Sequence, residues 1–183
     1  MPDKRILNIV DEQGNIIDEE TREKIHTDGL LHREVHVWLY TPRGEIIFQH
    51  RGKNKDTYPD LLDASVGGHV EVGFDFEETA LKELFEETGI KAKVDDLTLI
   101  QIKPHKSFDT TTNKINNVLR ASYAYCYDGK IENLKTEDSE ALGFETWSFE
   151  ALQNISDKDK RRFITSVFKP AITEILAKIQ KII

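Results

Sequence analysis

Residues 67–90 read GGHVEVGFDFEETALKELFEETGI, and this stretch decides the fold of the chain. It opens with a short glycine-rich loop over residues 67–73. Asp75 is a good N-cap residue, and Glu78 three positions later completes a capping box, so a helix is predicted to begin there. Gly89 is predicted to end that helix as the residue after its last turn. The stretch therefore predicts a tight loop that runs directly into a helix.

The predicted helix carries three glutamates on one side. Glu83, Glu86 and Glu87 follow one another at spacings that place them within one arc of a helix. Like charges so arranged repel each other, and the helix gains from them only where a cation lies between them. A divalent ion that prefers hard oxygen ligands, Mg²⁺ or Mn²⁺, is the expected cation, and such an ion also favours phosphate substrates.

A solvated acidic face is the competing interpretation, because acidic residues are common on exposed helix surfaces. Two features of the stretch favour the metal. The neighbouring arc of the helix is apolar and is expected to face a core, and it consists of Ala80, Leu81, Leu84 and Phe85. The preceding loop contains the glycines that a close approach of backbone carbonyls to a ligand requires.

Apolar patterns and turn residues predict strands on both sides of this stretch. Hairpins are expected over residues 5–18 and 35–50, the second with a Pro-x-Gly turn. Further strands are expected near 96–103, 119–127 and 144–149. Helices are expected over 149–155, 157–168 and 171–182, with a break at Pro170. This mixture favours an α+β fold or an α/β/α sandwich.

The chain has 183 residues, 38% of them hydrophobic and 32% charged, as in an ordinary globular protein. One domain, residues 1–183, is expected, with an N-terminal hairpin extension at 1–31 and a C-terminal helical segment at 157–183. The net charge of −8 argues against a nucleic-acid polymer as partner. The single cysteine, Cys126, excludes an intrachain disulfide and a cysteine-based zinc cluster. No signal-peptide pattern or membrane-length apolar run is present, so a cytoplasmic location without membrane contact is expected.

Gly68 and the run KELFEETGI at residues 82–90 resemble the Nudix box, the signature of the Nudix hydrolase superfamily. That signature is a glycine, five residues, a glutamate, seven residues, and then Arg-Glu-aliphatic-any-Glu-Glu-any-Gly-aliphatic. The resemblance is strong over residues 68–90 and weak over the second hairpin and the later strands. It implies an α+β Nudix fold, an α/β/α sandwich with a mixed central sheet.

Two positions depart from the signature. Phe74 stands where the first glutamate is expected, and Lys82 stands where the arginine is expected. Lysine keeps the positive charge but loses the planar fork of arginine, so a bidentate contact becomes a single point contact. Lys82 still reaches Glu86 one turn further on. The departures leave open a catalytically weak Nudix module that binds a nucleotide without turnover.

The resemblance implies a role for each acid of the box. Glu86 and Glu87 are implied as primary ligands of Mg²⁺ or Mn²⁺, and Glu83 as a further ligand or its orienter. The carbonyl near Gly68 is implied to complete the inner shell. In such a site the metal neutralises a diphosphate and ionises or positions the water that attacks phosphorus.

A further acid from outside the box often serves as metal ligand or base in this family. Glu140 is the preferred candidate, ahead of Glu137 and Asp138. A solvated acidic loop is at least as good an interpretation of any one of them. The expected catalytic set is therefore Glu83, Glu86, Glu87 and Glu140.

The box handles only the metal and the diphosphate, so the rest of the substrate is recognised elsewhere. Three basic residues after the second hairpin are candidates for holding phosphate: Arg51, Lys53 and Lys55. Tyr58 and Trp38 are candidates for stacking on a base, although basic loops and aromatics more often have no such role. The expected substrate is a small molecule, a nucleoside diphosphate linked to a further group, with nucleoside triphosphates as the near alternative. The C-terminal helix is expected to pack on its own core or on a second subunit of a homodimer.

Another enzyme of the same fold is the rival interpretation. Residues 63–66 and the Gly-His pair at 68–69 resemble isopentenyl diphosphate isomerase, which needs a catalytic cysteine directly before that pair. This chain has Gly67 there, so hydrolysis is preferred to isomerisation. Three histidines fall at places that suit the metal-binding histidines of the isomerase: His26, His32 and His69. In the simpler interpretation they are structural and none needs to bind a metal.

Overall fold

All strands of the described residues belong to one mixed sheet. The computed structural model describes residues 5–55, 57–110, 112–136 and 141–183. The strands are β1 (Ile6–Val10), β2 (Ile16–Thr21), β3 (His32–Tyr40), β4 (Glu45–Arg51), β5 (Leu62–Asp63), β6 (Val66–His69), β7 (Leu97–Asp109), β8 (Lys114–Cys126) and β9 (Ala141–Ser148). The helices are α1 (Arg22–Asp28), α2 (Phe76–Thr88), α3 (Phe149–Gln153), α4 (Asp157–Lys160) and α5 (Pro170–Ile179), and short 3₁₀ helices lie at Val94–Asp96, Ile131–Asn133 and Thr165–Phe168.

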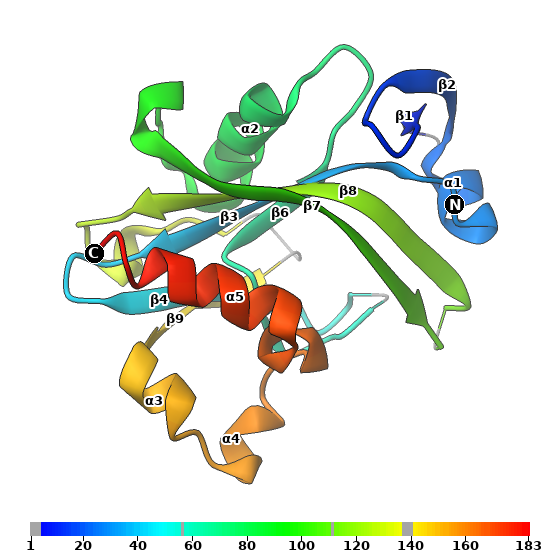
Figure 1. Cartoon of the computed structure of the whole chain (residues 1–183). Helices are drawn as coiled ribbons and strands as arrows, with labels where there is room; N and C mark the ends of the chain where they lie inside the picture. Colours follow the sequence, from blue (N-terminus) through cyan, green and yellow to red (C-terminus); the bar gives the residue numbers. More distant parts are fainter. Residues whose placement is uncertain (1–4, 56, 111, 137–140) are drawn as a thin grey trace.

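β3 is the strand on which the sheet is built. Along its whole length it pairs in parallel with β8. On its other side it pairs antiparallel in turn with β1, β6 and β4. β2, β7, β5 and β9 extend the sheet by antiparallel pairing. The sheet is therefore mixed and strongly curved, and α2 covers one face while α5, with α3 and α4 near it, covers the other (Figure 1). The predicted α+β class is confirmed.

Successive side chains of a strand point to opposite sides, and in β3 the side chains of both sides are buried. Val35 and Val37 belong to one apolar cluster with Leu84 of α2. Trp38 belongs to a second cluster with Ile175 of α5. A strand covered on both faces reads as a continuous apolar run, which explains why the sequence around 35–40 is so apolar.

The ends of α2 are formed as the sequence predicts. The side chain of Asp75 accepts a hydrogen bond of 2.8 Å from the Glu78 backbone, and the Glu78 carboxylate accepts one of 3.0 Å from the Asp75 backbone. Gly89 has a φ of +74°, in the left-handed region, and its N–H donates to the Phe85 carbonyl at 2.8 Å. Local chemistry alone is thus enough to set where this helix begins and ends.

The apolar face of α2 is narrower than the sequence suggests. Ala80, Leu84 and Thr88 form the buried stripe of the helix. Phe85 is 49% exposed, and its ring lies 5.8 Å from the Lys91 ammonium. The prediction that Phe85 faces the core was wrong, because it lies about 100° around the helix from the buried stripe.

The helix predicted over residues 157–168 is also wrong. α4 covers only Asp157–Lys160, the chain then runs beside β5, and Thr165–Phe168 forms a short 3₁₀ helix. Leu62 donates its N–H to the Arg162 carbonyl at 2.7 Å and accepts from the Ile164 N–H at 2.9 Å. Phe163 is buried in edge-to-face contact with Phe48, Trp147 and Phe168. Strand pairing and aromatic burial together outweigh the helical preference of this segment.

The C-terminal helix packs on the chain's own core. α5 begins at Pro170, as expected of a residue that suits the first helical turn. Its buried side chains Ile172, Ile175, Leu176 and Ile179 join the cluster of Trp38. The apolar face of α5 is therefore already covered within the chain. The expected homodimer stays a prediction. Within the described parts of the chain, no helix is long and apolar enough to span a membrane.

The capping box of α2 gives a direct stability test. Replacing Asp75 by alanine removes the acceptor for the Glu78 N–H, so Asp75→Ala should lower the free energy of unfolding by about 1 kcal/mol. Urea unfolding followed by circular dichroism measures this. Asp128→Ala, at an exposed aspartate after β8, is the matched control and should change little. Equal stability of the two variants would mean that the cap does not hold the helix.

Candidate functional site

The acids of α2 line a large polar cleft beside the sheet. Its volume is about 1100 Å³, enough for a nucleotide-sized ligand. The cleft is lined by Arg5, Arg22, Glu23, Glu34, His36, Gln49, Arg51, Asn54, Lys55, Asp63, Ala64, Gly67, Gly68, His69, Lys82, Glu83, Glu86, Glu87 and Lys114. Three carboxylates of one helix face thus share a hollow with several cationic side chains.

Lys82 is the cation nearest to the acids of α2. Its ammonium lies 3.3 Å from Glu86 Oε2, 3.5 Å from Glu83 Oε1 and 3.9 Å from Glu71 Oε1. The lysine therefore reaches Glu86 one turn on, as the sequence predicts, and contacts the other two acids as a point charge. One ammonium among three carboxylates leaves an excess of negative charge at this end of the cleft.

Glu87 is the most enclosed acid of the three. Gln49 of β4 donates from Nε2 to Glu87 Oε2 at 2.5 Å and so orients the carboxylate. Burial raises the pKa of Glu87 to about 8, against the opposing effect of the Gln49 hydrogen bond. Burial likewise raises the pKa of Glu83. Burying carboxylates close together costs free energy unless a cation lies between them.

Position 68 has room only for glycine while Glu83 keeps its place. An added Cβ at this position would lie 2.3 Å from the Glu83 carboxyl carbon and 2.5 Å from its Oε1. The Glu83 carboxylate therefore occupies the place that any other side chain at 68 would need. Gly67 is a milder case, because a Cβ there would meet the His36 ring at 3.0 Å. The role of the Gly68 carbonyl as a metal ligand stays a prediction.

The basic residues predicted to hold phosphate differ in position. Arg51 lines the cleft, but it donates to Asp63 Oδ2 at 3.1 Å and to the Thr57 carbonyl at 2.9 Å, so it also organises the loop after β4. Lys55 lines the cleft and its charge acts on Glu87. Lys53 is exposed and does not belong to the cleft lining as described.

Three cationic residues of the cleft were missed by sequence reasoning. Arg5, Arg22 and Lys114 come from the N-terminal segment, α1 and β8 and meet at the cleft. Their sequence neighbours contain no phosphate-binding motif. Only the pairing of β1 with β3 and of β8 with β3 brings these segments to the site.

The remaining candidates are not part of the cleft lining as described, or they fall outside the described residues. Glu140, with Glu137 and Asp138, lies outside the described residues. Trp38 is only 1% exposed and belongs to the core, so the prediction that it stacks on a base was wrong. The reason is the covering of its face of β3 by α5. Tyr58 is exposed but is not part of the described cleft lining.

The position that the isomerase interpretation needs is a glycine in the cleft. Gly67 lines the hollow beside Gly68, and a glycine has no group for proton transfer. Cys126 ends β8, where it pairs with Tyr40, and it is not among the described residues of the cleft. The thiol therefore does not replace the missing cysteine.

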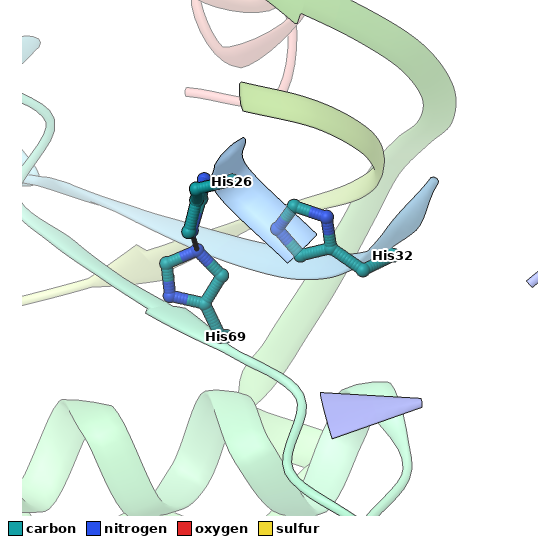
Figure 2. Close-up of side chains that lie close together, drawn as sticks. All are labelled: His26, His32 and His69. Atoms are coloured by element: carbon teal, nitrogen blue, oxygen red, sulfur yellow. Dashed lines mark hydrogen bonds between the residues drawn. The ribbon is translucent and has the colours of Figure 1, made fainter. Parts of the chain in front are cut away.

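Three histidines lie close together, and one of them, His69, lines the cleft (Figure 2). His26, His32 and His69 each offer a ring nitrogen, and these nitrogens lie within 4.8 Å of one another. Burial lowers the pKa of all three rings, that of His26 to about 4. The resemblance to the isomerase singles out these three positions, and the structure brings their rings together.

Comparison with known proteins identifies the family. The model of the NUDIX domain family matches residues 30–167. An uncharacterized Nudix hydrolase of Clostridium acetobutylicum is 32% identical over 144 residues, which are 77% of this chain and 68% of the relative. Another from Yersinia pestis is 38% identical over 84 residues, 46% of each protein, so the chain matches about half the length of that relative.

Solved structures show the same fold at low identity. DR0079 of Deinococcus radiodurans has a TM-score of 0.62 and 23% identity, covering 81% of this chain and 86% of that one. The NUDIX domain of Shewanella oneidensis NrtR, complexed with ADP ribose, has a TM-score of 0.57 and 13% identity, covering 81% and 87%. The mixed, curved sheet with its helices is thus an α+β Nudix fold, and the chain belongs to the Nudix family of hydrolases.

Proposed function

We propose that this chain is a metal-dependent hydrolase that cleaves the diphosphate linkage of a small nucleotide-type molecule. One observation carries the proposal: Glu83, Glu86 and Glu87 converge on one cleft, with the rest of the site built around them. The reaction adds one water across a P–O–P linkage, so that each product leaves with one side of the broken bond. The proposed activity agrees with the Nudix hydrolase names of the relatives.

The residues present fit Mg²⁺ or Mn²⁺. Carboxylate oxygens are the ligands that these hard ions prefer, and the three acids exceed the single ammonium of Lys82 beside them. We therefore assign Glu86 and Glu87 as ligands, Glu83 as a ligand or its orienter, and the Gly68 carbonyl as a further donor. The bound ion would neutralise the diphosphate and lower the pKa of water.

The chain's own residues hold these acids in place. Lys82 bridges Glu83 and Glu86, so the two carboxylates share one point charge. Gln49 donates to one oxygen of Glu87, and the Gly67 backbone also donates to this carboxylate, so its orientation is held. The absence of a side chain at Gly68 lets Glu83 lie against the β6 backbone. These contacts reduce the rearrangement that the site needs when substrate arrives.

Cationic side chains of the cleft support a phosphate-bearing substrate. We propose Lys55 and Arg51 as phosphate contacts, with Arg22 and Lys114 further along the lining. Lys53 is left out of the proposed set because it lies away from the lining. Positive charge on both sides of a hollow attracts a polyanion and orients it.

A nucleoside diphosphate linked to a further group is the first substrate class to test. The Shewanella relative is complexed with ADP ribose, a molecule of this class. The cleft volume suits such a molecule better than a bare diphosphate. Phe, Tyr and Trp are absent from the described lining, so we expect the base to gain little from aromatic stacking. Nucleoside triphosphates are the near alternative.

The acids of α2 give the central test. Glu86→Gln and Glu87→Gln keep the side-chain shape but remove the charge, and each should lower kcat on ADP ribose by about 100-fold or more. Product formation is followed by chromatography with Mg²⁺ or Mn²⁺, over a panel that includes nucleoside triphosphates. Glu77→Gln, on the exposed first turn of the same helix and outside the cleft, is the matched control.

Two outcomes of this assay would contradict the proposal. If the protein binds nucleotides of the panel but shows no metal-dependent turnover, it is a nucleotide-binding module. The departures from the signature at Phe74 and Lys82 would then explain the lost activity. Isomerised product from isopentenyl diphosphate that survives Glu87→Gln would show an isomerase.

Gly68 gives an independent test of the geometry. Gly68→Ala places a methyl group where the Glu83 carboxylate lies, so Glu83 must move. Displacement of a catalytic group by about 1 Å can cost about 100-fold, and kcat should fall by up to that factor. Gly67→Ala is the matched control, since its methyl group needs a shift of only a few tenths of an ångström. Thermal unfolding shows whether both variants fold. A folded Gly68→Ala with unchanged kcat would rule out the assigned role of Glu83.

A further inference from the structure

His36 is a cleft residue whose ring makes no hydrogen bond to any other described residue. It lies on β3, lines the cleft and stands directly opposite Gly67 of β6. Its Nδ1 is buried and has no hydrogen-bond partner among the described residues. A buried and unpartnered side-chain nitrogen is uncommon in native proteins, so it needs an explanation.

The burial of Nδ1 sets the tautomer of the ring. A neutral imidazole carries one N–H and one lone pair, and a buried N–H without a partner is rarer than a buried acceptor without one. The lone pair therefore lies on Nδ1, and Nε2 carries the proton. Nε2 is not among the buried unpartnered atoms, so it keeps contact with the open space of the cleft. The ring thus presents an N–H donor to the cleft.

This donor lies beside the acids of α2. A Cβ added at Gly67 would lie 3.0 Å from His36 Cδ2 and 3.3 Å from His36 Nε2, so this edge of the ring faces the Gly67 backbone. The N–H of Gly67 donates to the Glu87 carboxylate. The same residue therefore contacts both the ring and the most enclosed acid. A phosphate group held at Glu87 would be within reach of His36 Nε2.

The nearest acid on β3 does not use this donor. Glu34 lies two residues before His36 and lines the cleft with it. Its Oε2 accepts from Arg120 Nε at 2.7 Å, and its Oε1 lies 3.5 Å from Asn116 Nδ2. Both oxygens thus face donors of β8. The His36 N–H is left for a ligand.

The His36 ring is neutral at physiological pH. Burial, and after it the Arg120 guanidinium, lower the pKa of His36 to about 3, against the opposite effect of Glu34. His105 and Arg51 lower this pKa further. A group with such a pKa is poorly suited to proton transfer at neutral pH, but its N–H still donates a hydrogen bond.

We propose that His36 is a further catalytic residue, whose Nε2–H donates a hydrogen bond to a phosphate oxygen of the bound diphosphate. This assignment rests on the proposed hydrolysis, because it gives the donor to the phosphate group held at the acids. A fixed donor stabilises the negative charge that grows on phosphate oxygens as the P–O–P linkage breaks. The proton stays on the ring throughout.

Hydrolysis of ADP ribose by two variants tests the donor. His36→Leu removes the N–H, so kcat should fall by about 100-fold. His36→Gln offers an amide N–H at a similar reach, so kcat should return to within about 10-fold of the parent value. The acid limb of the pH profile should be the same in the parent and in His36→Gln, because the ring does not titrate there. His50→Leu is the matched control and should keep kcat, because His50 pairs with Asp60 and is not part of the described cleft lining.

Two further measurements do not depend on turnover. Imidodiphosphate has a P–N–P linkage in place of the cleaved bond and should bind in the presence of Mg²⁺. Calorimetry should show its binding weakened by about 10-fold in His36→Leu. Nitrogen NMR of histidine-labelled protein should find the proton on Nε2 of His36, and imidodiphosphate should shift this resonance. The spectrum of His36→Gln assigns the signal, and thermal unfolding shows whether the variants fold.

The outcomes separate this donor from the proposed function. A parent chain without turnover, in which imidodiphosphate binding still depends on His36, would reject the hydrolase and support the donor. A proton on Nδ1 of His36 would overturn the inference, and so would a parent chain that binds no imidodiphosphate. Unchanged kcat and unchanged imidodiphosphate binding in folded His36→Leu would also overturn it. Weaker binding of ADP ribose alone would place the donor on the sugar or the base and contradict the assignment to phosphate.

Discussion

The close contact between the Glu83 carboxylate and the backbone at Gly68 is the constraint on which the site depends. β6 is held by pairing of Gly68 with Val35 in the central strand. α2 is held by burial of Ala80 and Leu84 in the core. These contacts keep α2 beside β6, so that the acids of the helix line the cleft.

This arrangement concentrates negative charge at one end of the cleft. Burial raises the pKa of Glu87 and of Glu83, with Lys82 as the near counter-charge. A fold selected for stability alone would not gather carboxylates in this way. Clustering of unfavourable groups with perturbed pKa in a cleft is typical of functional sites, where a bound cation or substrate offsets the cost.

The fold gathers two kinds of metal donor at two different places. α2 supplies carboxylate oxygens, and the histidine cluster supplies imidazole nitrogens. Hard and borderline cations would therefore divide between them by ligand chemistry. β6 serves both places, since Gly68 contacts Glu83 and His69 faces His26.

The sequence by itself determined the features whose causes are local. The limits of α2 follow from Asp75, Glu78 and Gly89, and the common face of its acids follows from their spacing alone. The hairpins follow from short-range alternation and turn residues, which is why β1–β2 and β3–β4 were predictable. The family resemblance rests on the same short stretch.

Tertiary structure decided everything that depends on contacts between distant segments. Pairing with β5 and burial of Phe163 replaced the helix predicted over 157–168. Packing of α5 buried Trp38, and the angle of α2 on the sheet exposed Phe85. The histidine cluster and the missed cations of the cleft come from the N-terminal segment, α1 and several strands, which meet only in the folded chain. Local patterns carry no information on such meetings, because the free energy that stabilises them is released only when the whole sheet forms.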